Sequence, residues 1–528
     1  MDCVIGSGPA GVACAKGLLG RGRKILLLDA GLSLEPERAQ VVRQFAQGAP
    51  ENWSAADLAG YRAGMTADVR GVPQKLVYGS DFAYRGAEEH LGVSYSGVGL
   101  RPSLAQGGLS NVWGAAMLPY LESDVADWPF KIASLAEDYA AVIGLTGLAA
   151  CRDSLEQLFP LYTDQFTELR PSGQASRLLQ AMEKHRDGLQ QAGIYFGRSR
   201  LAVRGNAPAQ NNGCRYCRLC MYGCPYGYIY NAADTLRTFQ ALPDFKYQAS
   251  VIVTQVRETP GGVEILGYDR ESRQPLSWEC ERVFLAAGAI ATTRILLRSL
   301  EAYDQAVSLK DSQYFLLPLL LRRKARGAAQ ESLHALSQVF LEVFDPAAQG
   351  KAAHIQVYSD SDLSGQAIEQ AFGPFRRPLS FLVRDLRERL LVAQGFLHSD
   401  HSARIAVRLK RDASTGNERL ELAAERNPAA AVLVKRLVRR LFRQGRRLGA
   451  FPLPPMLKLA EPGRSFHCGG SFPMHTHPQG FQTDLLGRLP GWKRVHAVDA
   501  TVLPSVPATT ITFTVMANAH RIGRQSAP

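Results

Sequence analysis

Residues 3–11 read CVIGSGPAG, and this stretch decides the fold. Its first three residues predict a short apolar strand, and Gly6, Gly8 and Gly11 form a G-x-G-x-x-G turn that leads into a helix over 12–19. The glycines allow a tight turn, close approach of the backbone to a pyrophosphate, and packing of the helix on the strand. The amino end of the helix also favours phosphate charge. We therefore expect a dinucleotide to bind at this turn.

A second strand and an acidic residue complete the nucleotide-binding pattern. Residues 24–28 (KILLL) predict a strand that ends at Asp29, 18 residues after Gly11. An acid at this distance is placed to accept hydrogen bonds from an adenosine ribose.

Three later segments predict further parts of the same architecture. Residues 105–120 (AQGGLSNVWGAAMLPY) form a paired-glycine loop, and residues 282–299 (RVFLAAGAIATTRILLRS) predict a strand, a glycine turn and a helix. Residues 492–521 predict a strand with Asp499 at its end, a proline-broken loop and a long helix. β-type runs such as 405–409 indicate a separate sheet-based domain between them.

Together these motifs resemble the glucose-methanol-choline oxidoreductase family of FAD enzymes, and the resemblance runs from end to end of the chain. It is specific in VIGSGPAG with LLLDAG, in AQGGLSNVWG, in FLAAGAIATTRILL, and in SFHCGGSFPM with the segment VHAVDATVLPSVPATTITFTVMANAHRI. The resemblance implies an α/β fold with a Rossmann-like FAD-binding domain and a discontinuous α+β substrate domain built on a sheet.

The domain boundaries that we expect follow from this resemblance. The FAD-binding domain comprises residues 1–140, 200–300 and 455–528, and the substrate-binding domain comprises 141–199 and 301–454. A cysteine-rich segment spans 211–228.

The resemblance also implies which residues contact FAD. They are Gly6, Gly8, Gly11, Asp29, Gly107, Gly108, Asn111, Ala287, Gly288 and Asp499. Some sugar oxidases of the family bond covalently to flavin through a histidine in the tryptophan loop, where this chain has Val112. We therefore expect FAD to bind without a covalent link.

The resemblance places His467, in SFHCGG, where the family has its active-site base. Oxidation of a C–OH group releases a hydride and a proton, and a histidine is suited to take the proton near neutral pH. The family's second His or Asn is replaced by Thr510, whose hydroxyl donates and accepts hydrogen bonds but is not a base. The nearby histidines are expected to be structural or exposed; they are His398, His401, His475 and His477.

Residues 213–227 read GCRYCRLCMYGCPYG, in which Cys214, Cys217, Cys220 and Cys224 follow the C-x2-C-x2-C-x3-C-P spacing of bacterial ferredoxins. Three interpretations compete: an iron–sulfur cluster, a zinc site of four thiolates, and a structural turn with free or bridged thiols. In two-cluster ferredoxins the fourth cysteine serves the other cluster. A cluster here therefore needs Cys224 to bend back, or a remote ligand among Cys3, Cys14, Cys151, Cys280 and Cys468.

Composition bounds the remaining possibilities. The chain has 528 residues with 46% apolar residues, and no apolar run approaches the roughly 20 residues of a membrane-spanning helix. Because the first residues already belong to the nucleotide-binding motif and the thiols are clustered, we expect a cytoplasmic protein.

The formal charge of +13 raises the question of an anionic partner. Residues 433–447 predict an amphipathic helix with a basic outer face. A solvated face is the first interpretation, and contact with a membrane surface or an acidic partner is the second. Nucleic acid is not expected, because no recognition motif accompanies the charge.

The function expected from the sequence is FAD-dependent oxidation of a C–OH group of a sugar, polyol or other alcohol. Under the cluster interpretation, electrons pass through the cluster to an external acceptor, which makes the enzyme a dehydrogenase instead of an oxidase. A redox-neutral isomerase, epimerase or lyase on the same scaffold is one alternative, and an electron-transfer flavoprotein is another. The ferredoxin-like cysteine spacing favours the first and last of these three, and His467 in its family setting favours the first.

Overall fold

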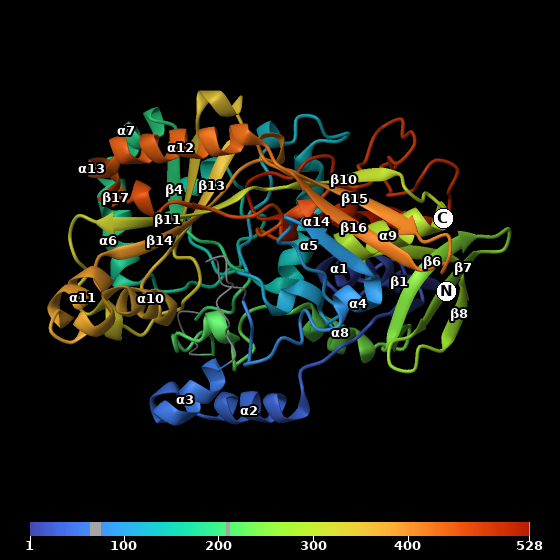
Figure 1. Cartoon of the computed structure of the whole chain (residues 1–528), viewed down its shortest axis with the longest axis horizontal. Helices are drawn as coiled ribbons and strands as arrows, with labels where there is room; N and C mark the ends of the chain where they lie inside the picture. The colour runs from blue at the N-terminus through green and yellow to red at the C-terminus, as the bar shows by residue number, and fades with distance from the viewer. Residues whose placement is uncertain (64–74, 207–211, 527–528) are drawn as a thin grey trace.

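The structure is a computed structural model that describes residues 1–63, 75–206 and 212–526. Residue 211, at the start of the predicted cysteine-rich segment, lies outside the described residues, as do 64–74 within the predicted range 1–140. Figure 1 shows an elongated molecule with two sheet-based halves side by side and both termini in the same half.

A five-stranded parallel sheet forms the core of the half that holds both termini. Its order is β20-β9-β1-β2-β5, with β20 at Val495–Ala497, β9 at Arg282–Leu285, β1 at Asp2–Ile5, β2 at Ile25–Leu28 and β5 at Phe245–Gln248. All four neighbouring pairs are parallel. The two faces are covered, which explains why β2 is continuously apolar rather than alternating. The predicted strands at the first motif, at KILLL and at RVFL are confirmed.

The first and last long helices of the chain pack directly on each other. In α1 (Pro9–Leu19) a Cβ added to Gly17 would lie 2.4 Å from the His520 carbonyl oxygen of α14 (Ile511–Gln525). In α14 a Cβ added to Gly523 would lie 2.4 Å from the Cys14 carbonyl oxygen. The two backbones therefore touch at two glycines.

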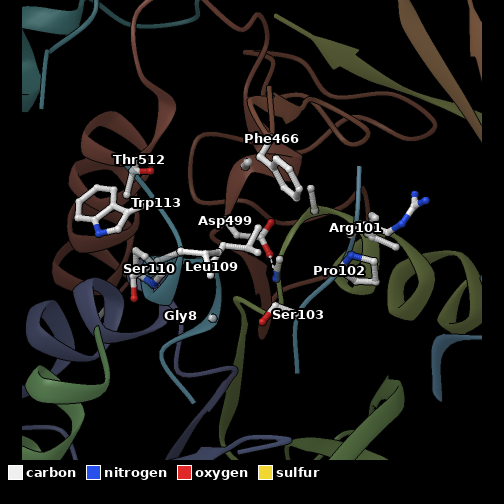
Figure 2. Close-up of a pocket in the computed structure, with 18 of the residues that line it drawn as sticks. Gly8, Arg101, Pro102, Ser103, Leu109, Ser110, Trp113, Phe466, Asp499 and Thr512 are labelled. Carbon is white, nitrogen blue, oxygen red and sulfur yellow. Dashed lines mark hydrogen bonds between the residues drawn. The ribbon is translucent and has the colours of Figure 1, made fainter. Parts of the chain in front are cut away.

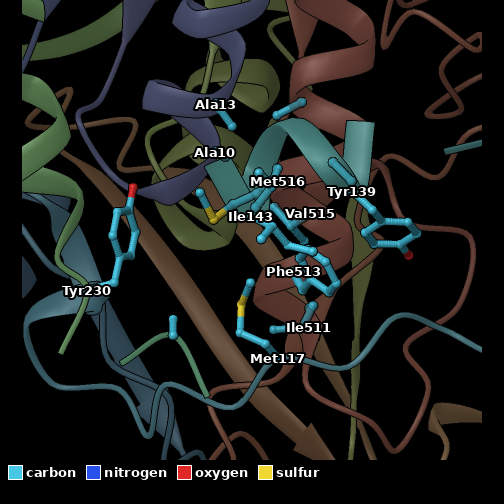
Figure 3. Packing of buried hydrophobic residues seen from close by; sticks show 14 of the residues in the cluster. Ala10, Ala13, Met117, Tyr139, Ile143, Tyr230, Ile511, Phe513, Val515 and Met516 are labelled. Carbon is cyan, nitrogen blue, oxygen red and sulfur yellow. The ribbon is translucent and has the colours of Figure 1, made fainter. Parts of the chain in front are cut away.

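Side chains complete the interface between these helices. Figure 3 shows Ala10 and Ala13 of α1 beside Met516 of α14, with Tyr139 of α5 (Ala136–Thr146) next to Phe513. The Tyr139 and Phe513 ring centroids are 4.5 Å apart. The first and last helices of the chain therefore pack in the same apolar core.

The other half contains a large antiparallel sheet in the order β17-β11-β14-β13-β12-β4, with β18 also paired to β11. Its strands are β4 Ile194–Arg198, β11 Tyr314–Leu321, β12 Val339–Phe344, β13 Ala352–Tyr358, β14 Leu390–Phe396, β17 Ala450–Pro452 and β18 Lys458–Leu459. One face packs in an apolar cluster with α6 (Gly173–Glu183) and α12 (Pro428–Arg443). The opposite face carries polar side chains toward the first half.

Two further sheets flank the parallel sheet. One has the order β19-β10-β15-β16-β3, and the other is the antiparallel β6-β7-β8. Their strands are β3 Val93–Ser96, β10 Ala306–Asp311, β15 Arg404–Arg411, β16 Glu418–Glu425, β19 Cys468–Gly469, β6 Val251–Glu258, β7 Val263–Asp269 and β8 Pro275–Cys280. Although β10, β15 and β16 fall in the predicted range 301–454, they share an apolar cluster with β9. The domain boundaries stay a prediction.

The remaining helices lie mainly around these sheets. They are α2 Pro36–Gln47, α3 Ala55–Arg62, α4 Ala87–Leu91, α7 Arg186–Gln191, α8 Ala232–Gln240, α9 Ala289–Ser299, α10 Asp362–Phe372, α11 Ser380–Arg387 and α13 Gly445–Leu448. The predicted basic helix is α12, which ends at Arg443 instead of continuing to 447. Two of its arginines, Arg436 and Arg440, pair with Asp345. No helix that the structure describes combines the length and the apolarity needed to cross a bilayer.

The contact between α1 and α14 is tested by Gly17→Ala. The added methyl group overlaps backbone that has no room to move, so we expect a loss of about 1–3 kcal/mol in the free energy of unfolding. The matched control is Gly144→Ala in α5, where an added Cβ meets nothing within 4 Å and a gain of about 0.5–1 kcal/mol is expected. Chemical denaturation measures both, and equal effects would contradict the packing argument.

Candidate functional site

A cavity of about 430 Å³ lies between the parallel sheet and the polar face of the large sheet. Its floor consists of the turns after β1 and β9, and its far wall includes residues of β13 and β14. Figure 2 shows Gly8, Ser110 and Asp499 gathered around this space, with Phe466 above them. The site is therefore shared by segments that lie hundreds of residues apart in the sequence.

The glycines of the first turn leave a clear space in front of the backbone. A Cβ added to Gly8 would meet nothing within 4 Å, and Gly8 lines the cavity. A Cβ on Gly6, whose φ is +100°, would lie 2.6 Å from the Ala286 carbonyl oxygen, and one on Gly11 would lie 1.9 Å from that of Gly6. Gly6 and Gly11 thus keep the turn tight, while Gly8 opens it to a ligand.

Three helices begin at this cavity. The residues that precede α1, α9 and α14 are Gly8, Gly288 and Thr510, and all three line the cavity. None of these helix starts is capped by a side-chain hydrogen bond. Because helix amino ends carry partial positive charge and free N–H groups, the cavity favours an anionic ligand such as a pyrophosphate.

Asp29 lies at the end of β2 in a hydrogen-bonded group on the cavity wall. Ser7 Oγ donates to Asp29 Oδ2 at 2.5 Å, and Tyr247 Oη donates to the same oxygen at 3.2 Å. Burial raises the pKa of Asp29 to about 6, although the hydrogen bonds from Ser7 and Tyr247 act to lower it. Asp29 also lines the cavity, where its carboxylate is placed to accept a further hydrogen bond from a sugar hydroxyl.

The paired-glycine loop contributes to the site unevenly. Gly108 lines the cavity, and a Cβ there would lie 3.3 Å from the Gly8 Cα. Gly107 is absent from the lining, and its amide donates to Ser7 Oγ at 2.9 Å. Asn111 donates to the Gly108 carbonyl at 2.7 Å and accepts from Asn231. Gly107 and Asn111 therefore shape the loop rather than face the cavity.

Asp499 connects the turns at the ends of β20 and β9. Its Oδ2 accepts from the Gly288 amide at 2.9 Å and from Thr292 Oγ1 at 2.5 Å, while Oδ1 accepts from the Thr501 amide at 3.0 Å. Burial raises its pKa. Asp499, Ala287 and Gly288 all line the cavity, so Asp499 both braces the floor and faces the ligand space.

His467 lies on the cavity wall opposite the glycine turn. Its ring stacks on Phe396 with centroids 4.9 Å apart, and its buried Nδ1 has no hydrogen-bond partner among the described residues. Burial, with a smaller contribution from His354, lowers the pKa of His467 to about 3. The imidazole is therefore neutral at physiological pH, with a nitrogen free to accept a proton.

Thr510 is near the site but its hydroxyl is already engaged. Its Oγ1 donates to the Ala116 carbonyl at 2.9 Å, which leaves only acceptor capacity toward the cavity. The four secondary histidines do not line the cavity. His475 and His477 are exposed and bond to each other, whereas His398 and His401 bond to the carbonyls of Asp124 and Ala348, respectively.

The large sheet has a polar face that we did not predict from the sequence. Glu342 and His354 are fully buried and their Oε1 and Nδ1 atoms are 2.6 Å apart. His354 Nε2 lies 3.3 Å from Gln356 Nε2, and Tyr358 Oη donates to Gln356 Oε1 at 3.0 Å. Gln356 and Tyr358 line the cavity, as does Gln394 in the next strand. The alternation in HIQVY was the available signal, because it places residues 354, 356 and 358 on one face.

Lys75 was also not predicted as a site residue, and it lies close to both the cavity and the cysteine segment. Its side chain lines the cavity, and Nζ donates to the Trp113 carbonyl at 2.9 Å. Burial lowers its pKa to about 8, while the nearby Cys220 and Cys224 act to raise it. A half-buried cation on the cavity wall thus lies near two of the four thiols.

The four cysteines of the segment lie in one loop, where Cys220 is buried and Cys214, Cys217 and Cys224 are half-buried. Backbone amides point at three of the sulfurs: Tyr216 to Cys214 at 3.5 Å, Ala335 to Cys220 at 3.3 Å and Tyr228 to Cys224 at 3.4 Å. Burial raises the pKa of Cys217 to about 12 and that of Cys220 to about 11, with neighbouring thiols adding to both. Met221, inside the loop, lines the cavity.

The loop does not form a site for a single metal ion. Within residues 1–63, 75–206 and 212–526, no group of three or more His, Cys, Asp or Glu side chains is arranged to hold one. A tetrahedral zinc site requires sulfurs roughly 3.8 Å apart, from Zn–S bonds of about 2.3 Å. The zinc interpretation is therefore not supported. All nine cysteines are free thiols, which also removes the bridged form of the structural turn.

Comparison with known proteins supports the architecture. No family model and no curated protein matches the sequence. Among solved structures, pyridoxine 4-oxidase from Mesorbium loti aligns over 99% of this chain and 98% of its own, with a TM-score of 0.58 and 15% identity. At this identity the likeness establishes the fold alone. It confirms the α/β fold class that the sequence resemblance implied.

Gly8→Val tests whether the glycine turn holds a dinucleotide. The larger side chain enters the cavity without meeting protein atoms at its Cβ, so we expect FAD content to fall below about a tenth of wild type while the unfolding midpoint of the FAD-free protein stays unchanged. Absorbance at 450 nm after purification measures the first and calorimetry the second. Gly11→Val is the contrasting variant, because its Cβ overlaps backbone and should destabilise the protein itself. Full FAD content in Gly8→Val would contradict this assignment.

Proposed function

We propose that this protein is an FAD-dependent oxidoreductase that oxidises a C–OH group, with His467 as the base. One observation carries the proposal: a single cavity brings together an open glycine turn, three uncapped helix starts and a neutral histidine with an unpartnered nitrogen. The name of the structural neighbour, pyridoxine 4-oxidase, supports a reaction of this type.

The cofactor-binding half fits FAD by its chemistry. Gly8 admits the pyrophosphate in a turn that Gly6 and Gly11 keep tight, although Gly11 itself does not line the cavity. Asp29 is suited to a ribose, and the cavity is further lined by Gly108, Ala287, Gly288 and Asp499. Gly107 and Asn111 support this lining from behind. Bound FAD supplies a two-electron acceptor for hydride. We propose that it binds without a covalent link.

The chain's own residues handle the proton and the substrate's orientation. Conversion of C–OH to C=O breaks one C–H bond and one O–H bond, and the proton from oxygen passes to the His467 imidazole. Phe396 fixes the plane of that ring by stacking. Thr510, as an acceptor only, is suited to orient a substrate hydroxyl by receiving its hydrogen bond.

The polar wall favours a substrate with several hydrogen-bonding groups. Gln356 and Gln394 are directly paired across β13 and β14, so two carboxamides face the cavity side by side. Each carboxamide both donates and accepts, as Tyr358 also does. We propose a small polyhydroxylated alcohol or a sugar as substrate, ahead of an apolar alcohol.

We further propose that Cys214, Cys217, Cys220 and Cys224 hold an iron–sulfur cluster that transfers electrons to an external acceptor. Amide donors at three of the sulfurs and the adjacent Lys75 cation supply the hydrogen bonds and charge that such clusters use. The absence of a single-ion geometry among the described residues does not oppose a cluster, because its thiolates bind different irons. The remote cysteines have other neighbours: Cys3 and Cys280 contact each other, Cys151 contacts Asp153, Cys468 contacts Asp311, and Cys14 packs against Gly523 of α14. Cys224 is therefore the preferred fourth ligand.

Anaerobic mixing with a library of alcohols and sugars tests the central proposal. Bleaching of the flavin absorbance by one substrate class supports oxidation. Substrate turnover without a change in flavin redox state would indicate the redox-neutral alternative, and reduction only by a protein partner would indicate an electron-transfer flavoprotein.

His467→Ala tests the assigned base. Loss of a positioned base should slow flavin reduction by about 10²–10⁴-fold while FAD content is unchanged, as measured by anaerobic stopped flow. Because burial lowers the pKa of His467 to about 3, its imidazole is unprotonated above that value, and the wild-type rate should be flat from pH 5 to 8. His475→Ala, in an exposed loop, is the control. A wild-type rate in His467→Ala would exclude this role.

Anaerobic purification tests the cysteine segment. We expect one cluster per FAD, which is about four irons and four acid-labile sulfides per FAD, and loss of both in Cys214→Ser, Cys217→Ser and Cys220→Ser. Cys151→Ser, outside the loop, is the matched control. Intact cluster content in Cys224→Ser would indicate a three-iron cluster or a distant ligand. Protein with full FAD and neither iron nor sulfide would refute the cluster and leave a structural role for the turn.

A further inference from the structure

The helical hairpin formed by α10 and α11 projects from one end of the molecule (Figure 1). Its tip exposes three large apolar side chains within eight residues: Phe375 at 65%, Phe381 at 57% and Leu382 at 43%. Only Gly365 and Ile368 of α10 and Val383 of α11 are buried beneath it. The apolar tip is therefore not needed to close the core of the hairpin.

Three arginines surround these apolar residues. Arg376, Arg377 and Arg384 are exposed, and none forms an ion pair with a described residue. Farther down the hairpin, by contrast, Arg387 pairs with Asp360 and Arg389 pairs with Asp385. The tip thus presents uncompensated positive charge next to exposed aromatic and aliphatic groups.

This combination matches the chemistry of an anionic bilayer surface. Aromatic and aliphatic side chains enter the boundary between headgroups and acyl chains, while arginines attract anionic headgroups. A second copy of the same hairpin is a poorer partner, because a symmetric contact would bring like charges together. The positive charge of the tip therefore favours contact with an anionic lipid surface over contact with a second copy of the hairpin.

The base of the hairpin is rigidly attached beside the cysteine segment. The buried Asp360 carboxylate accepts from Arg218 at 2.9 Å and from Arg387 at 2.8 Å, and Asp362 pairs with Arg62 at 2.8 Å. Arg218 lies between Cys217 and Cys220 in the sequence. The hairpin is therefore attached next to the cysteine loop.

We propose that the tip of the α10–α11 hairpin, residues 374–384, docks the protein on an anionic lipid bilayer. The basic helix α12, which the sequence indicated for such a contact, is the weaker candidate, because its two exposed apolar side chains, Val432 and Phe442, lie ten residues apart and do not cluster. The docking is independent of the oxidation chemistry, since it needs neither FAD nor a substrate.

Co-sedimentation of the FAD-loaded protein with vesicles tests this inference. Wild type should bind vesicles of 30% phosphatidylglycerol in phosphatidylcholine, and binding should weaken as salt is raised. The triple variant Arg376→Gln/Arg377→Gln/Arg384→Gln should bind about 100-fold more weakly, since each arginine near the surface contributes about a factor of five. Phe375→Ser/Phe381→Ser/Leu382→Ser should abolish binding.

The matched control is Val432→Ser/Phe442→Ser on α12, where two exposed apolar side chains also lie among basic residues and wild-type binding is expected. FAD content and unfolding midpoint verify that each variant is folded. No binding by wild type, equal binding to pure phosphatidylcholine, or unchanged binding by the hairpin variants would overturn the proposal. A dimer in sedimentation equilibrium that only the hairpin variants dissociate, without vesicle binding, would assign the tip to self-association instead.

Discussion

The backbone contact between α1 and α14 is the constraint on which the rest of the molecule depends. Gly17 and Gly523 bring the first and last helices closer than any side chain would allow. That contact holds the two helices side by side, and each begins at the cavity, after Gly8 and after Thr510. Because peptide dipoles add along a helix, the geometry that closes the fold also sets the electrostatic character of the site.

The two faces of the large sheet have different roles: one packs in an apolar cluster, and the other carries polar side chains next to the cavity. On one face, strands β11 to β14 contribute to an apolar cluster with α6 and α12. On the other face, alternation aligns Glu342, His354 and Gln356, of which Gln356 lines the cavity. A buried carboxylate and imidazole are costly to desolvate, and they are retained here as a hydrogen-bonded pair that ends at the substrate wall. The same low-polarity surroundings keep His467 neutral.

The cysteine loop, Lys75 and the α10–α11 hairpin form a connected side of the molecule. Lys75 contacts the cavity and influences Cys220 and Cys224, while Asp360 ties the hairpin to Arg218 within the loop. An electron that leaves the cavity through the proposed cluster would therefore emerge next to the proposed membrane-docking hairpin. These three features lie on one side of the molecule, although they span about 300 residues of the sequence.

Local sequence determined the elements whose signals are short-range. CVIGSGPAG, KILLL and RVFLAAGAIATTRILL specify strands, tight turns and helix starts, because glycine conformation and apolar runs act over a few residues. The remaining features of the site depend on contacts between residues that are far apart in the sequence. Only the folded chain shows that Gly107 and Asn111 lie behind the cavity, that Lys75 reaches the thiols, and that Glu342 meets His354, because such contacts depend on how distant strands and loops come together. Residue types give the chemistry available, but tertiary packing sets each group's partners and exposure to water, and therefore its charge.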